Sequence, residues 1–361
     1  VRFLSIKKIA KEAGVSTATV SRVLNNPGYK CSSEELRERI WKIARELNYM
    51  PNEAARNLKK GITDTSQKVW YLDVLMTRTG NLETDPFFSE LLRVIESEIH
   101  RQGCILMHIF HQPLFSNDRK CRTENIDKVI AQMEPDGDIR SDGLIIIGKC
   151  NDNVLKKLSA KYKSIVSVNR NSTNYLVDEV ICDGKRIAAL AVEYLIGLGH
   201  RKIGYVGDCH NESRYKGYQD TLFHYGIDMD ISYVIEAEHT EAEGYAVMER
   251  LIQRGDAPTA IYCANDMIAI GMLKCLNKYK NRYYVPSIIS SDDIEEAQYT
   301  KPMLTSVRLP KEEMGKFALY LLVDRLSGGH KGIVRTELEG KLMIRESCTL
   351  VENANRMEYY I

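Results

Sequence analysis

Several signatures of membrane, secreted and enzymatic proteins are missing from this 361-residue chain. No apolar run approaches the 18 residues of a membrane span, and no signal-peptide pattern opens the sequence, so we expect a cytoplasmic protein without a membrane partner. The nine cysteines are scattered and form no C-x-x-C pair, which argues against a disulfide framework and a zinc site. No P-loop, GxGxxG, GxSxG or HExxH motif is present, so neither an enzyme nor a cofactor is indicated.

His108 and His111 in the segment HIFH are the remaining candidate metal ligands. The segment is expected to form a strand, on which residues three apart face opposite sides. This geometry argues against a shared ion, and no metal site is expected.

Charge is distributed unevenly along the chain. Residues 1–61 contain 13 Lys or Arg residues against 6 Glu, a net charge of +7, whereas the remaining residues carry −6. A compact basic head attracts phosphate groups in a salt-dependent way that ignores base sequence. A charged, solvated surface has the same composition, so the motifs in the head must decide between the two.

Three short amphipathic helices are predicted in this basic head. The first runs through SIKKIAKEAG and ends at Gly14, and the second lies in VSTATVSRVLNN with Ser16 as its N-cap. The third has Ser33 as its N-cap and runs through EELRERIWKIARELNYM. A helix, a glycine turn, a second helix and a third helix are the parts of a helix-turn-helix domain. The second helix of that domain reads the major groove of DNA.

The second helix leaves a face of small side chains pointing outward. Thr17, Ala18 and Ser21 add little bulk to this face, and Arg22 can donate two hydrogen bonds to a guanine edge. Such a face suits insertion into a narrow polar groove. An ordinary solvated helix is the alternative.

The segment PNEAARNLKKG, residues 51–61, follows the head and is too short to form a stable helix alone in water. It is expected to fold on contact with DNA. Leu58 then has two interpretations, an apolar wedge between base steps of the minor groove or a packed leucine in a linker turn, and periodicity alone favours the turn.

From about residue 68, strands alternate with helices in two successive runs. The first run extends from KVWYLDVLM (68–76) to SIVSVN (164–169), and the second from the helix at 184–198 to YVPSIIS (284–290). This alternation predicts two α/β lobes with parallel, Rossmann-like sheets and a ligand cleft at the carboxyl ends of the strands. Residues 111–142, with one helix near 124–134, are expected to form an unusual connection.

The chain resembles the lactose-repressor (LacI/GalR) family of bacterial transcription regulators over nearly its whole length. The resemblance is carried by the head sequence and, in the body, by SDGLIII, LIGLGHRKIGYVG, CANDMIAIGML and LTSVRLPKEEMGKFALYLLVDRL. It implies an all-α helix-turn-helix head, a hinge helix and a two-lobed body with a periplasmic-binding-protein-like fold. It also implies a homodimer that binds double-stranded operator DNA as a repressor of sugar-utilisation genes, under allosteric control by a small effector.

The resemblance implies four segments. The helix-turn-helix domain spans 1–50 and the hinge helix 51–61. The N-terminal lobe combines 62–178 with 307–338, and the C-terminal lobe combines 179–306 with 339–361.

Positions that contact DNA in the family map onto both the head and the hinge. Leu58 falls on the minor-groove wedge of the family, so the resemblance favours the wedge over the linker turn. The DNA-binding residues that the resemblance implies are Ser16, Thr17, Ala18, Ser21, Arg22, Asn25, Ala55, Leu58 and Lys59.

Positions that contact the effector in the family lie at the ends of strands in the body. Arg214 falls where the family has an arginine that grips the effector, and Asp292 where it has an acid that accepts sugar hydroxyls. Asp293 is expected to cap the following turn and Asp266 the helix 267–277. The full set of implied effector residues is Phe87, Asn169, Arg214, His239, Asn265 and Asp292.

Some positions depart from the family pattern. SSDD (290–293) replaces the common Gly-aromatic-Asp-Asp, His239 replaces a flat aromatic residue, and Gly184 follows Asp183 in place of a polar residue. A sugar or glycoside is the expected effector and a nucleobase is the second choice. A periplasmic solute receptor shares the body but lacks the basic head, and an activator has the same sequence features as a repressor.

Overall fold

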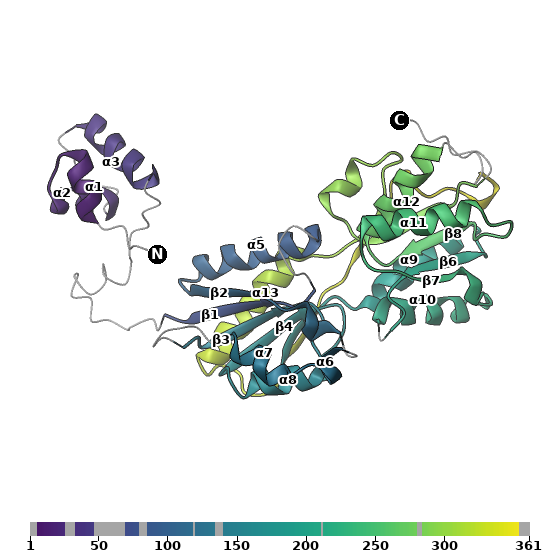
Figure 1. Ribbon diagram of the computed structural model, residues 1–361, viewed down its shortest axis with the longest axis horizontal. Coiled ribbons are helices and arrows are strands. Elements are labelled where there is room, and N and C mark those ends of the chain that lie inside the picture. The colour runs from purple at the N-terminus through teal and green to yellow at the C-terminus, as the bar shows by residue number, and fades with distance from the viewer. Residues whose placement is uncertain are drawn as a thin grey trace. The chain divides into compact units, whose positions relative to one another are not determined.

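The computed structural model describes residues 6–25, 33–46, 69–78, 85–117, 120–133, 140–210, 212–279 and 284–353 (Figure 1). The chain divides into two compact units, Val1–Lys68 and Val69–Ile361. The expected hinge at 51–61, with Ala55, Leu58 and Lys59, lies outside the described residues.

The first unit contains the three predicted helices, α1 (Ile6–Ala13), α2 (Thr17–Asn25) and α3 (Glu34–Glu46). The side chains of Ser16 and Ser33 accept hydrogen bonds from the backbone N–H groups of Thr19 and Leu36, at 3.1 and 3.2 Å, so both expected caps are confirmed. A small apolar core holds the helices together. It consists of Ile9, Ala10, Ala13, Val20, Val23, Ile40 and Ile43.

The second unit contains two six-stranded sheets, and the first has the order β11-β5-β4-β3-β1-β2 with all pairings parallel. Its strands are β1 (Tyr71–Met76), β2 (Ile105–His111), β3 (Gly143–Ile147), β4 (Ser164–Asn169), β5 (Asp178–Ile181) and β11 (Arg335–Glu337). Its helices are α5 (Pro86–Arg101), α6 (Lys120–Thr123), α7 (Ile126–Ala131), α8 (Asp152–Ser159) and α13 (Lys311–Leu326).

Alternate side chains of β3 show how both faces of this sheet are covered. Leu144 and Ile146 join the apolar cluster that includes residues of α7 and α8, whereas Ile145 and Ile147 join the cluster that includes residues of α5 and α13. Helices therefore lie on the two faces of the sheet, as the continuous apolar strands predict (Figure 1).

The second sheet has the order β12-β10-β9-β8-β6-β7 and is parallel except for the antiparallel pairing of β10 with β12. Its strands are β6 (Ile203–Gly207), β7 (Val234–Glu236), β8 (Ala260–Cys263), β9 (Ser287–Asp292), β10 (Thr305–Arg308) and β12 (Lys341–Met343). Its helices are α9 (Gly184–Gly197), α10 (Ser213–His224), α11 (Glu241–Ile252) and α12 (Asp266–Tyr279), and α9 contacts α10 as α11 contacts α12.

The chain passes between the sheets after β5, β10 and β11. β5 pairs with β4 through Asp178–Ile181, so the lobe boundary expected at 178/179 falls inside a strand of the first sheet. β10 pairs with β9 through Thr305–Arg308, so the boundary expected at 306/307 falls inside a strand of the second sheet. Strand pairing therefore moves both crossings a few residues toward the C-terminus.

The irregular stretch at 111–142 contains a 3₁₀ turn η1 (Pro113–Ser116) and the two short helices α6 and α7. The helix expected near 124–134 is limited to Ile126–Ala131, with the side chain of Asn125 accepting from the N–H of Lys128 at 3.1 Å. Three further 3₁₀ turns are η2 (Ile231–Tyr233), η3 (Glu295–Gln298) and η4 (Val351–Asn353). No helix in the described part of the chain has both the length and the apolar character needed to cross a membrane.

Candidate functional site

The second helix of the first unit, α2, exposes the side chains of Thr17 and Arg22. Ser16 precedes it and is also exposed, while its hydroxyl caps the helix. The side chains of Ala18, Ser21 and Asn25 lie outside the described part of the chain, although their backbone belongs to α2. The two described side chains of the predicted outward face, those of Thr17 and Arg22, are therefore exposed to solvent.

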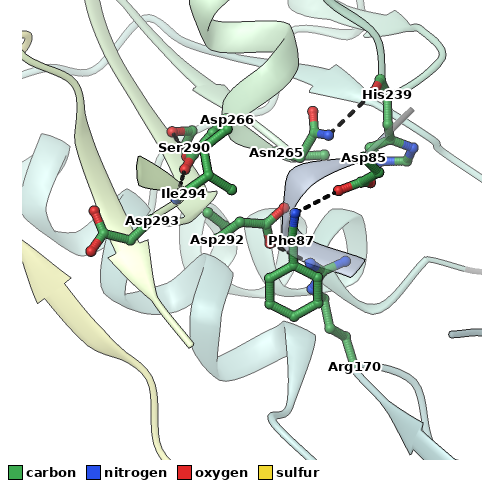
Figure 2. A network of polar contacts seen from close by, with 12 residues as sticks. Asp85, Phe87, Arg170, His239, Asn265, Asp266, Ser290, Asp292, Asp293 and Ile294 are labelled. Carbon is green, nitrogen blue, oxygen red and sulfur yellow. Dashed lines mark hydrogen bonds and ion pairs between the residues drawn. The ribbon is translucent and has the colours of Figure 1, made fainter. Parts of the chain in front are cut away.

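A cluster of polar side chains gathers in the second unit, where strands of both sheets end (Figure 2). The first sheet supplies Asn169 at the end of β4, and Phe87 lies in the first turn of α5. The second sheet supplies the loops and helix starts that carry the other predicted effector residues. These are Arg214, His239, Asn265 and Asp292.

An ion pair joins the two halves of this cluster. The guanidinium of Arg170, directly after β4, contacts the carboxylate of Asp292 at the end of β9, and their side chains are 8% and 3% exposed. The Arg170 guanidinium also lies 4.3 Å from the centre of the Phe87 ring, so it covers one face of that ring. Phe88 is buried in the core.

Asp292 and the next residue have unusual backbone geometry. Their φ angles are +126° and +50°, in the region that L-amino acids other than glycine rarely occupy. Such strain persists where surrounding contacts fix it, and it concentrates at functional sites.

Asp293, which was expected to cap the following turn, has another role. Its carboxylate forms ion pairs at 2.6 Å with Arg308 and with Arg345, and η3 begins after Ile294 without a side-chain cap. The expectation is wrong because two arginines of neighbouring segments reach the carboxylate.

Arg214 is held by the chain itself. Its Nε donates to Oε1 of Glu212 at 2.9 Å, its Nη1 to the carbonyl of Ala264, and both charged side chains are nearly inaccessible to solvent. Burial alone raises the pKa of Glu212, but the charge and hydrogen bond of Arg214 outweigh it and lower the pKa to about 2. The pair is therefore ionised at neutral pH.

His239 lies between two arginines. Nη2 of Arg78 contacts both ring nitrogens, the Nε2 contact at 3.1 Å, and Nη2 of Arg214 lies 3.3 Å from Nε2. Burial and the charges of Arg78, Arg214 and Arg170 hold the pKa of His239 well below 6.5. The imidazole is therefore neutral under physiological conditions.

Asn265, and not Asp266, takes the capping role that was expected of Asp266. Oδ1 of Asn265 accepts from the N–H of Ile268 at 3.1 Å and so caps α12, while its Nδ2 donates to the carbonyl of His239 at 3.3 Å. Asp266 accepts from the hydroxyl of Ser290 and from the N–H of Ile294 (Figure 2). It also accepts from the hydroxyl of Ser306. Burial and the nearby Asp292 raise the pKa of Asp266 to about 7. The expected cap at Asp266 is wrong because the serines of two strands engage its carboxylate.

Asp85 is a site residue that the sequence analysis did not identify. Its side chain accepts from the N–H of Phe87 at 3.1 Å and caps α5. Burial and the negative charge of Asp292 raise its pKa to about 6. The signal for the cap was present, because an aspartate before a proline is a common helix start.

Three further residues, Arg78, Arg170 and Glu212, were also missed. Each follows a strand or precedes a helix in a loop of ordinary composition. Only the topology of the two sheets brings them beside the predicted residues.

Asn169 lies on the margin of the cluster. Its Oδ1 accepts from the N–H of Arg170 at 2.7 Å. Asn169 is also the one predicted effector residue that lines a polar hollow of about 1170 Å³, whose basic lining includes Lys149, Lys185 and Lys216. The other predicted residues lie in the more closed cluster beside it.

Gly184 explains one departure from the family pattern. A Cβ atom at this position would lie 2.0 Å from Oγ of Ser213. That hydroxyl donates to the carbonyl of Arg170 at 3.1 Å and so links the two lobes. A side chain at position 184 would disturb this link.

A group that could ligate a metal ion occurs at Asp208, His210 and Glu236, whose ligand atoms lie within 4.8 Å of one another. His210 and Glu236 are exposed, and exposed acids often gather without an ion. His108, considered above, instead contacts Asp73 at 3.0 Å.

Comparison with protein families gives two matches. A model described as bacterial regulatory proteins, lacI family, matches residues 5–52, and one described as periplasmic binding protein-like domain matches residues 192–348. The HTH-type transcriptional repressor MelR of Bacillus subtilis (strain 168) is 30% identical over 357 residues, which cover 95% of this chain and 97% of that protein. The HTH-type transcriptional repressor PurR of Haemophilus influenzae (strain PittEE) is 29% identical over 360 residues, covering 95% and 98%.

Solved structures show the same fold. A complex of the transcriptional regulator CelR with cellobiose superposes with a TM-score of 0.65 at 24% identity, covering 96% of this chain and all of that one. The lac repressor dimer bound to operator and the anti-inducer ONPF gives 0.64 at 22% identity with the same coverage. The Escherichia coli transcriptional repressor ascG gives 0.61 at 26% identity, covering 78% of this chain and all of that one.

Proposed function

This chain belongs to the LacI family of bacterial regulatory proteins, and from this premise we propose that a sugar or glycoside, bound at the polar cluster, controls its affinity for operator DNA. As a member it is a DNA-binding transcriptional repressor with a ligand-binding body, and it is not an enzyme. The genes it represses are then those that use the sugar.

The head supplies the base contacts in this proposal. Arg22 is exposed on α2 and bonds a guanine edge through its planar fork, and Thr17 offers a hydroxyl and a methyl group nearby. Ser16, Ala18, Ser21 and Asn25 complete the reading face. Leu58, flanked by Ala55 and Lys59, enters the minor groove and opens a base step.

The observation that carries the sugar proposal is the convergence of complementary polar groups of the C-terminal lobe beside the ion pair with Arg170 of the N-terminal lobe. Asp292 is an acceptor, Arg214 is a donor, and Asn265 has both an amide donor and an acceptor. Hydroxyl groups of a sugar act as donors and acceptors at once, so they match such a mixed set. A sugar bound between these residues replaces hydrogen bonds that the protein groups now make with one another.

A nucleobase fits this cluster less well. Such a ligand stacks on an aromatic face, whereas the Phe87 ring at the cluster is 2% exposed and covered by Arg170. His239 stands where an aromatic platform is common in the family. The likeness in fold to a cellobiose complex also agrees with a sugar.

Control of DNA binding follows from where the ligand binds. The Arg170–Asp292 ion pair and the Ser213–Arg170 hydrogen bond join the lobes, so a ligand that competes for these groups changes how the lobes meet. In a homodimer bound to a pseudo-palindromic operator, this change favours or disfavours folded hinges. The coupling is reciprocal: operator DNA changes ligand affinity by the same factor.

A ligand screen tests the proposal. The purified protein is heated with neutral sugars, sugar acids, sugar phosphates and nucleobases, because a ligand that binds the folded state raises the midpoint of unfolding. Positive compounds are titrated against the wild type and Asp292→Asn. We expect a carbohydrate to bind at least tenfold more weakly to Asp292→Asn. Binding of nucleobases alone contradicts the proposal.

A further inference from the structure

The proposed sugar site contains three arginines, and two of them have carboxylate partners. Arg170 pairs with Asp292, and Arg214 pairs with Glu212. Arg78, the residue two positions after β1, has no carboxylate partner within the part of the chain that the structure describes. Its guanidinium instead contacts the ring of His239.

This contact places donors of two arginines against one imidazole ring. Nη2 of Arg78 and Nη2 of Arg214 both approach the imidazole of His239, at 3.1 and 3.3 Å from Nε2. A neutral imidazole has one N–H and one acceptor nitrogen. It therefore accepts from one arginine at most, and N–H groups of two arginines meet at one place with a single acceptor between them.

We propose that Arg78 and Arg214 bind an anionic group of the effector, a carboxylate or a phosphate carried by the sugar. This inference deepens the proposed function and rests on it, because the rest of the sugar occupies the positions near Asp292 and Asn265. Arg78 is then the residue that distinguishes an anionic sugar from a neutral one.

The chemistry of the two groups supports this assignment. Carboxylates and phosphates present two or three oxygens in a geometry that matches the guanidinium fork. Such oxygens accept from both arginines at once, which the ring of His239 does not do. Their negative charge also offsets the guanidinium of Arg78, which has no carboxylate partner among the described residues, and burial lowers the pKa of Arg78.

Inorganic phosphate and acetate are the first probes of this site. Their stabilisation of the wild type, Arg78→Gln and Lys216→Gln is compared at constant ionic strength, because phosphate stabilises most proteins weakly by exclusion from their surface. Lys216 is the matched control: it is exposed, lies in the same lobe as Arg214 and lines the neighbouring basic hollow. Arg78→Lys keeps the positive charge but lacks the planar guanidinium, and it replaces Arg78→Gln in this test if that variant fails to fold.

We expect apparent phosphate affinity to fall at least tenfold in Arg78→Gln, to fall severalfold in Arg78→Lys and to stay unchanged in Lys216→Gln. Equal stabilisation of all variants overturns the inference. So does a loss confined to Lys216→Gln, which places the anion in the hollow instead.

A sugar series then separates this inference from the proposed function. Neutral hexoses are compared with the corresponding uronates and hexose phosphates, which also distinguishes a carboxylate from a phosphate. Tighter binding of an anionic member, lost in Arg78→Gln, supports the inference. Tighter binding of a neutral sugar overturns it and leaves the proposed function standing. Arg78-dependent binding of phosphate with no sugar bound supports the anion site and contradicts the sugar proposal.

Discussion

Replacing Arg214 with alanine removes one partner of a buried ion pair and isolates Glu212 in the body. The Glu212 side chain is 2% exposed, and its pKa of about 2 in the folded protein compares with an ordinary value of 4.5. At 1.36 kcal/mol for each pH unit, this difference corresponds to about 3 kcal/mol of stability. Breaking a buried pair by removing one partner costs about 3–5 kcal/mol, which agrees in size.

The pH dependence gives this prediction its sign. Because the folded pKa of Glu212 is depressed, its contribution is fully present above pH 4.5 and is lost as the pH falls from about 4.5 toward 2. In Arg214→Ala, burial dominates and raises the pKa of Glu212, so its ionised form destabilises the variant at neutral pH. We expect the deficit of the variant to be largest at pH 7, to shrink as the pH falls toward 4.5, and to shrink further below pH 4.5.

Urea unfolding followed by circular dichroism measures this deficit at pH 7 and pH 4. Arg214→Ala with Glu212→Gln should recover part of the stability, because no buried charge remains. Lys185→Ala is the matched control, since Lys185 pairs with Asp220 at 2.8 Å on the surface and such pairs contribute about 1 kcal/mol or less. An Arg214→Ala deficit as small as that of Lys185→Ala, and equal at both pH values, refutes the reasoning.

Two further predictions concern helix caps. Asp85→Asn keeps a capping oxygen on α5 but removes a carboxylate whose pKa is raised to about 6, so it should stabilise the body at pH 7 and have little effect at pH 4, as judged by urea unfolding. A loss of stability at pH 7 contradicts the raised pKa. Ser16→Ala should destabilise α2 by about 1 kcal/mol, whereas Ser16→Thr should have a smaller effect. Amide hydrogen exchange of α2 measures this change, and equal exchange in wild type and both variants argues against the cap.

Much of the fold was predictable because hydrophobic periodicity is a local property of the sequence. The strand Ser164–Asn169 appears where expected, and the caps at Ser16 and Ser33 follow directly from residue type. Strand ends and lobe crossings were less predictable. They depend on pairing between distant strands, as β5 with β4 and β10 with β9 show.

The site was predicted only in part, because some of its residues belong to recognisable motifs and others do not. The resemblance supplied Arg214 and Asp292, whose positions come from recognisable motifs. It did not reveal Arg78 and Arg170, because their roles depend on contacts across the two sheets. Nor could the roles of Asn265 and Asp266 be assigned from spacing, because serines of β9 and β10 decide where the Asp266 carboxylate lies.

Operator binding with and without the ligand tests the central claim most directly. Fluorescence anisotropy at 150 mM salt would compare a duplex selected from a random library with random competitor, using the full-length protein and the carbohydrate found in the screen. We predict a preference of about 10³ or more for the selected duplex, and a change of about fivefold or more when the carbohydrate is saturating. The carbohydrate affinity should change by the same factor on the duplex. Equal affinity for selected and random duplexes, or carbohydrate binding that leaves operator affinity unchanged, would contradict the account.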